Sequence, residues 1–131
     1  MKQREIKFRI WYHNSCMDYS SDDFAIGMSG TMLNLDSDID GTGVEGFVLI
    51  KNRNFEYTLM QFTGLKDKNG KEVYEGDIIK KDNEIGVVEW SSDIVGYIWR
   101  KNKLSATALL QGTYRHCRII GNICENPELL K

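Results

Sequence analysis

Several features that would define a protein class are missing or scarce in this chain of 131 residues. Its longest unbroken apolar run, residues 47–50, is far shorter than the roughly 20 residues that a membrane-spanning helix needs. The three cysteines, Cys16, Cys117 and Cys124, are odd in number and widely spaced, unlike a disulfide framework. Charged residues fill the start of the chain, where a signal peptide has an apolar stretch. We therefore expect a protein of the reducing cytoplasm that is not exported and does not cross a membrane.

The chain also lacks an excess of positive charge. Seventeen basic and nineteen acidic side chains give a formal net charge of −2, so no overall positive field attracts nucleic acid. Apolar residues make up 41% and charged residues 27% of the chain, which are ordinary values for a globular domain. A chain of this length can bury enough apolar surface to fold without metals or disulfides.

Apolar and polar residues alternate in several short segments, which is the pattern of half-buried strands. The clearest is residues 5–11, where three apolar side chains alternate with Lys7 and Arg9. We expect the apolar side chains on the inner face and the two cations on the other. The other predicted strands are residues 28–35, 47–50, 55–62, 73–80, 85–90, 97–100, 106–110 and 117–123, although residues 104–111 also fit a short helix.

Turn signals separate the predicted strands in the second half of the chain. Residues 67–70 contain Asn-Gly, and residues 81–84 form a polar break between two apolar runs; both are typical of hairpin turns. The strands recur every 10–15 residues or so, which favours a meander or a small barrel over packed helices. Pro127 follows an asparagine that can cap a helix, but only one helical turn fits before the last residue, Lys131.

The segment of residues 36–46 contains two partial ligand-binding motifs. Its alternating aspartates open like an EF-hand calcium loop, but the closing position is Phe47 instead of a bidentate glutamate. Its glycines at 41, 43 and 46 match G-x-G-x-x-G, but a predicted strand follows, so no helix N-terminus is available for a phosphate. We interpret the segment as a solvated acidic turn.

Metal-binding and catalytic patterns fail on spacing. His13 with Cys16, and Cys117 with Cys124, do not reproduce the paired short spacings of structural zinc sites. In a strand, His116 and Cys117 would point to opposite faces, so they could not form a nucleophile–base pair. The sequence therefore predicts no catalytic residue, no metal site and no cofactor. An acid–base pair among the nineteen acidic residues stays open because nothing singles one out.

Aromatic residues cluster between positions 90 and 99, and cations follow them directly. Tyr97 and Trp99 share one face of a regular strand, where they either complete a core or contact a partner. Aromatic rings beside cations can also stack nucleobases and hold phosphates. The predicted interaction residues are Trp90, Tyr97, Trp99 and Arg100, with Lys101 and Lys103 added for nucleic acid.

One run of residues, 59–79, carries a specific pattern: Gln61-Phe62-Thr63-Gly64-Leu65, then Asp67 and Asn69-Gly70-Lys71-Glu72. Segments 4–9, 86–90 and 120–130 extend it to both ends of the chain. In these segments the chain resembles the YopX family, small proteins of phages and prophages. The resemblance implies a β-rich fold of one compact unit, with an N-terminal lobe over residues 1–62 that includes a variable loop, residues 15–46. It also implies a small SH3-like barrel over residues 63–131, no established enzymatic activity and assembly into homo-oligomers.

Turn formers within this pattern have physical roles in fixing the fold. Gly64 and Gly70 permit turns, and Gly76 lets the chain bend sharply. Asp77 can bond the nearby backbone at the start of a strand, and Tyr74 can pack across the bend while its hydroxyl finds a polar partner.

These observations together predict a mainly β protein of short antiparallel strands, with little helix. We expect a phage-encoded, non-enzymatic module of the bacterial cytoplasm that binds an unidentified protein or a second copy of itself. A nucleic-acid-binding module built on Tyr97, Trp99 and Arg100 is the alternative. A small enzyme would need a deep pocket that holds two carboxylates with opposed pKa shifts.

Overall fold

The fold is a set of short antiparallel strands, seen in a computed structural model that describes residues 2–12, 17–19, 24–26, 32–36, 46–49, 57–102, 105–108 and 113–131. These residues contain no α-helix and only two 3₁₀ turns, η3 (Thr113–His116) and η4 (Pro127–Leu130). The expected mainly β class is therefore confirmed. The strands are β1 (Phe8–Tyr12), β2 (Met17–Asp18), β3 (Phe24–Ile26), β4 (Met32–Asp36), β5 (Gly46–Leu49), β6 (Tyr57–Lys66), β7 (Glu72–Tyr74), β8 (Asp77–Lys81), β9 (Glu84–Ser91), β10 (Gly96–Asn102), β11 (Ser105–Ala108) and β12 (Arg118–Asn122).

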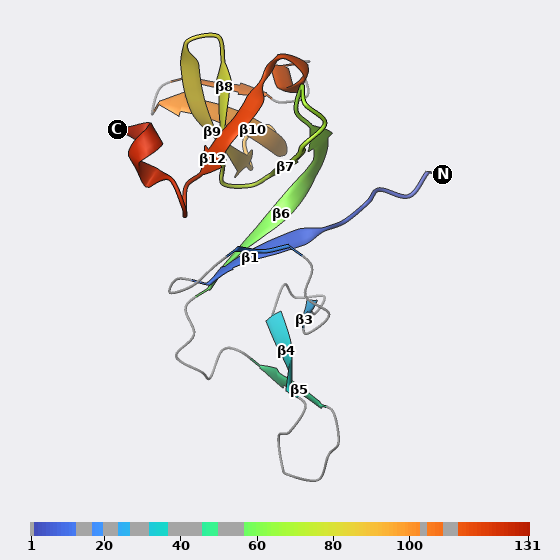
Figure 1. Cartoon of the computed structure of the whole chain (residues 1–131). Helices are drawn as coiled ribbons and strands as arrows, with labels where there is room; N and C mark the ends of the chain where they lie inside the picture. Colours follow the sequence, from blue (N-terminus) through green and yellow to red (C-terminus); the bar gives the residue numbers. More distant parts are fainter. Residues whose placement is uncertain are drawn as a thin grey trace.

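The C-terminal half forms a five-stranded sheet in the order β11-β10-β9-β8-β12. Strands β8 to β11 follow one another as hairpins, and β12 returns to pair with β8. The sheet curls into an open, barrel-like half (Figure 1). The predicted turn at residues 81–84 joins β8 to β9, with Lys81 opposite Glu84 and a positive φ of 53° at Asp82. Residues 105–108 form a strand, so the helix considered for residues 104–111 is not present there.

A four-stranded sheet, in the order β2-β1-β6-β7, holds the N-terminal strand. β1 pairs with the first half of β6 from Phe8 opposite Gln61 to Tyr12 opposite Tyr57. The second half of β6 pairs with β7, with Phe62 opposite Tyr74. This strand runs without a break through the predicted boundary between residues 62 and 63, and the division into two lobes stays a prediction. Strands β3, β4 and β5 form a separate three-stranded sheet.

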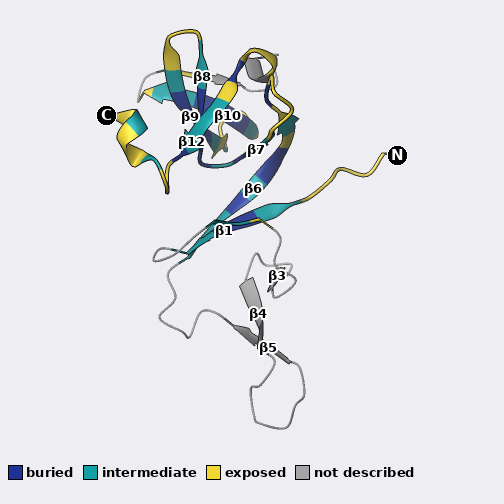
Figure 2. Cartoon of the chain, viewed as in Figure 1, coloured by how far each residue is buried: buried dark blue, intermediate teal, exposed yellow. Residues whose placement is uncertain are grey.

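The main core lies inside the curled sheet, where the strands show their buried faces (Figure 2). The largest fully buried side chain is Trp99, at 1% exposure, and its ring edge packs against the backbone of Gly86. A smaller apolar cluster surrounds Ile10 between β1 and β6. The other buried members of the main core are Val73, Ile79, Val88, Tyr97 and Cys117, with Leu65 and Ile119 packed against them.

Asp67 holds the β6–β7 turn to the C-terminal strand. One carboxylate oxygen accepts the backbone N–H groups of Asn69 and Lys71, both at 2.9 Å. The other accepts the N–H of Ile119 at 3.0 Å. The turn predicted at residues 67–70 is thereby confirmed, with Gly70 at a φ of +80°. The aspartate of the motif thus stabilises both a local turn and a contact between distant segments.

The bend between β7 and β8 has the predicted composition. Gly76 adopts a φ of +80°, and a Cβ there would come within 3.1 Å of Met60, so glycine suits the position twice over. Asp77 accepts the backbone N–H of Tyr74 at 2.8 Å, as expected for a side chain that fixes a strand entry. The Tyr74 hydroxyl donates to the Glu72 carboxylate at 3.1 Å.

The first strand differs from its prediction at both of its faces. Ile6 lies outside β1 and is 64% exposed, although we expected it on the inner face. Arg9 was expected on the face opposite the apolar core, and it is only 2% exposed. Both faces of β1 carry a buried residue: Ile10 packs with Tyr12, Tyr57 and Leu59, and Arg9 on the other face contacts the β7–β8 bend. None of the helices in the described part of the chain has the length and apolar character to cross a membrane.

Candidate functional site

A groove runs beside the β9–β10 hairpin, where the N-terminal arm (residues 2–7), β6 and the β7–β8 bend meet it. It consists of two adjoining hollows of about 270 and 380 Å³ that share Arg4, Trp90 and Tyr97. The smaller hollow is otherwise lined by Thr63, Leu65, Val95 and Gly96, and the larger one by Gln61 and Glu75.

Two aromatic rings form the wall that both hollows share. Trp90 and Tyr97 are cross-strand partners, and their ring centroids lie 5.2 Å apart in an edge-to-face arrangement. Trp90 is 49% exposed while Tyr97 is 7% exposed, so the pair presents one indole to solvent on a buried support. Burial raises the pKa of the Tyr97 phenol, and the negative charge of Glu75 raises it further. The phenol therefore stays neutral and can donate a hydrogen bond into the groove.

Glu75 places a carboxylate in the larger hollow. Its backbone is fixed by a bond from its N–H to the Gln61 carbonyl at 2.9 Å, and its carboxylate accepts the Gln61 N–H at 3.1 Å. Burial raises the pKa of Glu75, and that amide is the one group that opposes the shift. No salt bridge to Glu75 is found among the residues that the structure describes. The groove thus contains a half-buried acid that forms no salt bridge with the described residues.

The tip of the β9–β10 hairpin borders the groove with exposed apolar side chains. Ile94 is 53% and Val95 75% exposed. Val95 has a φ of 51°, a left-handed conformation that a β-branched residue rarely adopts. Such strain is retained where the surroundings or the function require it. We call the surface formed by Trp90, Ile94 and Val95 the Trp90 face.

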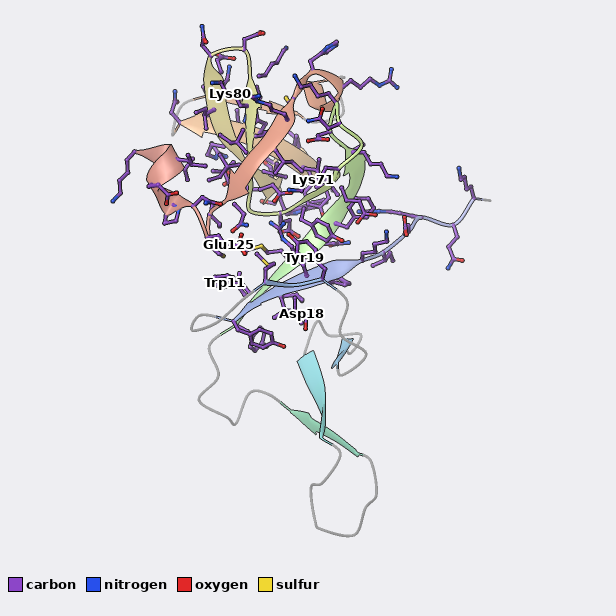
Figure 3. All side chains as sticks on the ribbon, in the orientation of Figure 1. Trp11, Asp18, Tyr19, Lys71, Lys80 and Glu125 are labelled. Atoms are coloured by element: carbon purple, nitrogen blue, oxygen red, sulfur yellow. The ribbon has the colours of Figure 1, made fainter. Side chains whose placement is uncertain are left out.

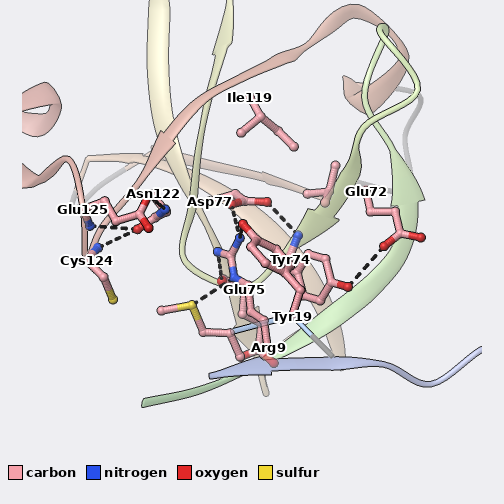
Figure 4. Close-up of polar contacts among 12 residues, drawn as sticks. Arg9, Tyr19, Glu72, Tyr74, Glu75, Asp77, Ile119, Asn122, Cys124 and Glu125 are labelled. Carbon is pink, nitrogen blue, oxygen red and sulfur yellow. Dashed lines mark hydrogen bonds and ion pairs between the residues drawn. The ribbon is translucent and has the colours of Figure 1, made fainter. Parts of the chain in front are cut away.

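A buried cation, Arg9, holds the bend that carries Glu75. Its guanidinium pairs with Asp77 at 2.8 Å and donates to the backbone carbonyl of Glu75 at 3.0 Å (Figure 4). Its Nε lies 3.3 Å from the Met60 sulfur, and its charge lies 5.0 Å from the centre of the Tyr74 ring. Every side of the ion is therefore occupied, as a buried charge requires.

Two tyrosines enclose this cluster, which we call the Arg9 cluster: Arg9, Met60, Tyr74, Asp77 and Tyr19. Tyr19 follows β2 and lies on the side of β1 that faces the curled sheet (Figure 3). Its ring meets that of Tyr74 edge to face at 5.8 Å. Burial and the Glu72 carboxylate raise the pKa of Tyr74 to about 12. Burial raises the pKa of Asp77, and Arg9 works in the opposite direction.

The structure separates the four predicted interaction residues. Trp90 is exposed on the groove, but Trp99 lies in the core at 1% exposure, so its assignment to an outer surface is wrong. Tyr97 and Trp99 do share a strand face, and that face is the inner one. Arg100 lies on the other face, where it forms an ion pair with Glu89. Only Trp90, and Tyr97 through its hydroxyl end, line the groove.

Arg4, Gln61 and Glu75 line the groove and had not been singled out from the sequence. Arg4 and Gln61 belong to segments that support the family resemblance, but nothing in their spacing marks them as neighbours. The positive charge at Arg9 was visible in the alternating pattern, but its burial was not. Contacts between residues this far apart in sequence have no local signal.

The thiols and histidines do not come together in the part of the chain that the structure describes. Cys117 is buried in the core and His116 is exposed, so they form no catalytic pair. Burial raises the pKa of the Cys117 thiol and also that of Cys124. No group of three or more potential metal ligands occurs among the described residues. His13, Cys16 and most of the segment of residues 36–46, namely 37–45, lie outside the described residues, as does Lys103.

The described fold is that of a β protein in which a four-stranded sheet and a curled antiparallel sheet are connected through the β7–β8 bend. A family model described as YopX protein matches residues 7–131. The chain therefore belongs to the YopX family, and the resemblance inferred from its sequence segments is confirmed.

Two solved structures are similar over almost the whole chain. Protein EF1440 from Enterococcus faecalis is 27% identical with a TM-score of 0.63, covering 98% of this chain and 100% of its own. Protein yopX from Bacillus subtilis is 27% identical with a TM-score of 0.57, covering 95% of each chain. No curated protein matches the chain.

Proposed function

We propose that this protein works by binding another protein through the Trp90 face, and that a second copy of the chain is one such partner. The observation that carries the proposal is the exposed apolar tip of the β9–β10 hairpin. Trp90, Ile94 and Val95 are apolar side chains with exposures of 49%, 53% and 75%. All three lie within a stretch of six residues. Tryptophan on a rigid support is a frequent anchor at protein interfaces.

Backbone strain at Val95 supports the same proposal. An exposed position with positive φ is easily filled by glycine or asparagine, yet this chain holds a β-branched side chain there. The side chain gains little from burial in the monomer, since it is 75% exposed. A contact with a partner would offset both the strain and the exposure.

The remaining parts of the proposal follow from the family and from the sequence. We place the protein in the cytoplasm of a bacterium that carries the phage or prophage, and we propose binding without catalysis. In support of this second point, the one carboxylate among the lining residues of the groove is that of Glu75, whereas an acid–base pair would need two.

The nucleic-acid alternative has less support. Trp99 is in the core, so it is unavailable to stack on a base. Arg100 is paired with Glu89, and Lys101 with Glu84 at 2.9 Å. No contact among the described residues favours this alternative. Gel retardation at two salt concentrations would detect any binding that depends on phosphate contacts.

Sedimentation velocity tests the proposal on the full chain at tens of micromolar. We expect the wild type to self-associate and Val95→Asp to sediment as a monomer, because a charge would be placed in the apolar contact. Leu130→Asp is the matched control: Leu130 is also exposed, at 45%, but lies on η4. It should leave the association unchanged. A wild type that is monomeric throughout, or equal loss in both variants, would count against the proposal.

A further inference from the structure

The larger hollow of the groove combines the features that recognise a positively charged side chain. Glu75 supplies a half-buried carboxylate, and Trp90 and Tyr97 supply aromatic surface beside it. Cations are attracted to aromatic faces and to carboxylates, and both attractions strengthen as water is excluded. We infer that this hollow binds the arginine side chain of a protein partner. This inference rests on the protein-binding function proposed above.

The charge balance of the bend supports this inference. The same bend contains two carboxylates, Asp77 and Glu75. Asp77 is paired with Arg9 inside the fold. Among the described residues, the Glu75 carboxylate has only the Gln61 amide as a partner, although burial raises its pKa and so disfavours its charged form. A cation brought by a partner would supply the missing charge, as Arg9 does for Asp77.

The chain itself shows that a guanidinium can reach the hollow. Arg4, on the exposed N-terminal arm, lines both hollows and lies close enough to Tyr97 to counteract the rise in its pKa. No salt bridge joins Arg4 to Glu75 among the described residues. Arg4 therefore lines the site without forming a salt bridge with Glu75, and we expect it to compete weakly with an incoming arginine.

The larger hollow has room for a long side chain. The hollow measures about 380 Å³ and is lined by five residues, with the apolar tip of the hairpin beside it. A partner segment could place one arginine against Glu75 and lay apolar neighbours on Ile94 and Val95. The anchor would thus combine one charged contact with burial of the exposed apolar area.

Titration of the full-length ¹⁵N-labelled protein with N-acetyl-arginine amide tests the inference. N-acetyl-citrulline amide is the matched probe, because it has the same size and shape but a neutral urea group. The chain has three tryptophans, so the indole N–H signals are few, and Trp90→Phe assigns the one that reports on the groove. We expect a saturable shift of the Trp90 signal with arginine at an affinity at least about fivefold higher than with citrulline.

Three variants locate the site. Glu75→Gln keeps an oxygen for the Gln61 amide but removes the charge, so arginine should bind no better than citrulline. Arg4→Ala should raise the affinity for arginine about twofold to threefold by removing a competing cation. Glu89→Gln makes the same change of net charge on the strand that carries Trp90 and should leave binding unchanged. An unshifted Trp99 signal in each variant shows that the core is intact.

Several results would overturn the inference: equal binding of the two probes, full arginine affinity in Glu75→Gln, or no shift at Trp90. Loss of self-association in Val95→Asp with no preference for arginine would leave the protein-binding function standing and remove the arginine site. The opposite result is a protein that stays monomeric but binds arginine through Glu75. That result would keep the arginine site and remove self-association.

Discussion

The two sides of the β7–β8 bend differ in whether their carboxylates form an ion pair. On the inner side, Arg9 and Asp77 are both nearly inaccessible and paired at 2.8 Å, with further donors and rings around them. On the outer side, the Glu75 carboxylate has one amide donor and no ion pair among the described residues. The inner side, where the charges are paired, fixes the fold, and the outer side is the one that we propose binds a partner.

Stability and binding make different demands on these two regions. A buried ion pair adds little compared with an apolar replacement, but breaking it leaves a charge without water or a partner. The groove instead retains features that cost free energy in the monomer: a strained valine, exposed apolar side chains and a half-buried acid. Proteins commonly keep such local costs where they bind.

The largest expected effect comes from breaking the inner pair. Arg9→Met should lower the free energy of unfolding by about 3–5 kcal/mol, because Asp77 would remain buried without its cation. Urea denaturation followed by circular dichroism measures the change. Lys101→Met is the control, since its pair with Glu84 lies at the surface and is worth about 1 kcal/mol or less. A loss below about 1 kcal/mol in Arg9→Met would show that the two regions do not differ as described.

The Arg9 pair also shows where sequence reasoning stops. Alternation in residues 5–11 correctly places Arg9 on the face opposite Ile10, but it cannot tell that the second face is covered as well. That cover comes from the bend at Glu75, whose carbonyl accepts from Arg9 across a long stretch of chain. A period of two separates faces; it does not say what lies against each one.

Local features were predicted well because they depend on neighbouring residues and not on contacts between distant segments. The turns at residues 67–70 and 81–84 follow from asparagine, aspartate and glycine acting on their own backbone. Tyr97 and Trp99 were placed on a common face, which is a local statement. That this face is internal depends on how the sheet curls, and the groove residues Arg4 and Glu75 meet only after that has happened.

An intermediate effect, of opposite sign, is expected on the outer side. Val95→Asn should raise the free energy of unfolding by about 1 kcal/mol, because asparagine tolerates positive φ better than a β-branched residue. Ile94→Asn is the matched control, since it removes a similar exposed side chain from a position without positive φ. Equal stability changes in the two variants, measured by urea denaturation, would remove strain as a feature of the Trp90 face.

The smallest effect is expected from the Glu75 charge. Burial raises the pKa of Glu75, so folding takes up protons and the contribution of this group to stability falls as the pH rises through its pKa range. Glu75→Gln should therefore be slightly more stable than wild type at pH 7, by less than about 1 kcal/mol in free energy of unfolding at this half-exposed site, and should unfold at a slightly higher temperature. The difference should narrow as the pH is lowered toward 4. Thermal melts that show a gap widening in acid would contradict this sign.

The pairing of β1 with β6 has a consequence for how such a chain can change over generations. Tyr12 and Tyr57 lie opposite each other in the ladder, and β2 also pairs with β1, so the polypeptide departs from this sheet after β2 and rejoins it at β6. Lengthening or trimming the excursion between them alters closure entropy only slowly and leaves the ladder in register. The stretch after Tyr19 and before β6 is thus a natural place to graft, shorten or exchange sequence without disturbing the body that carries the groove.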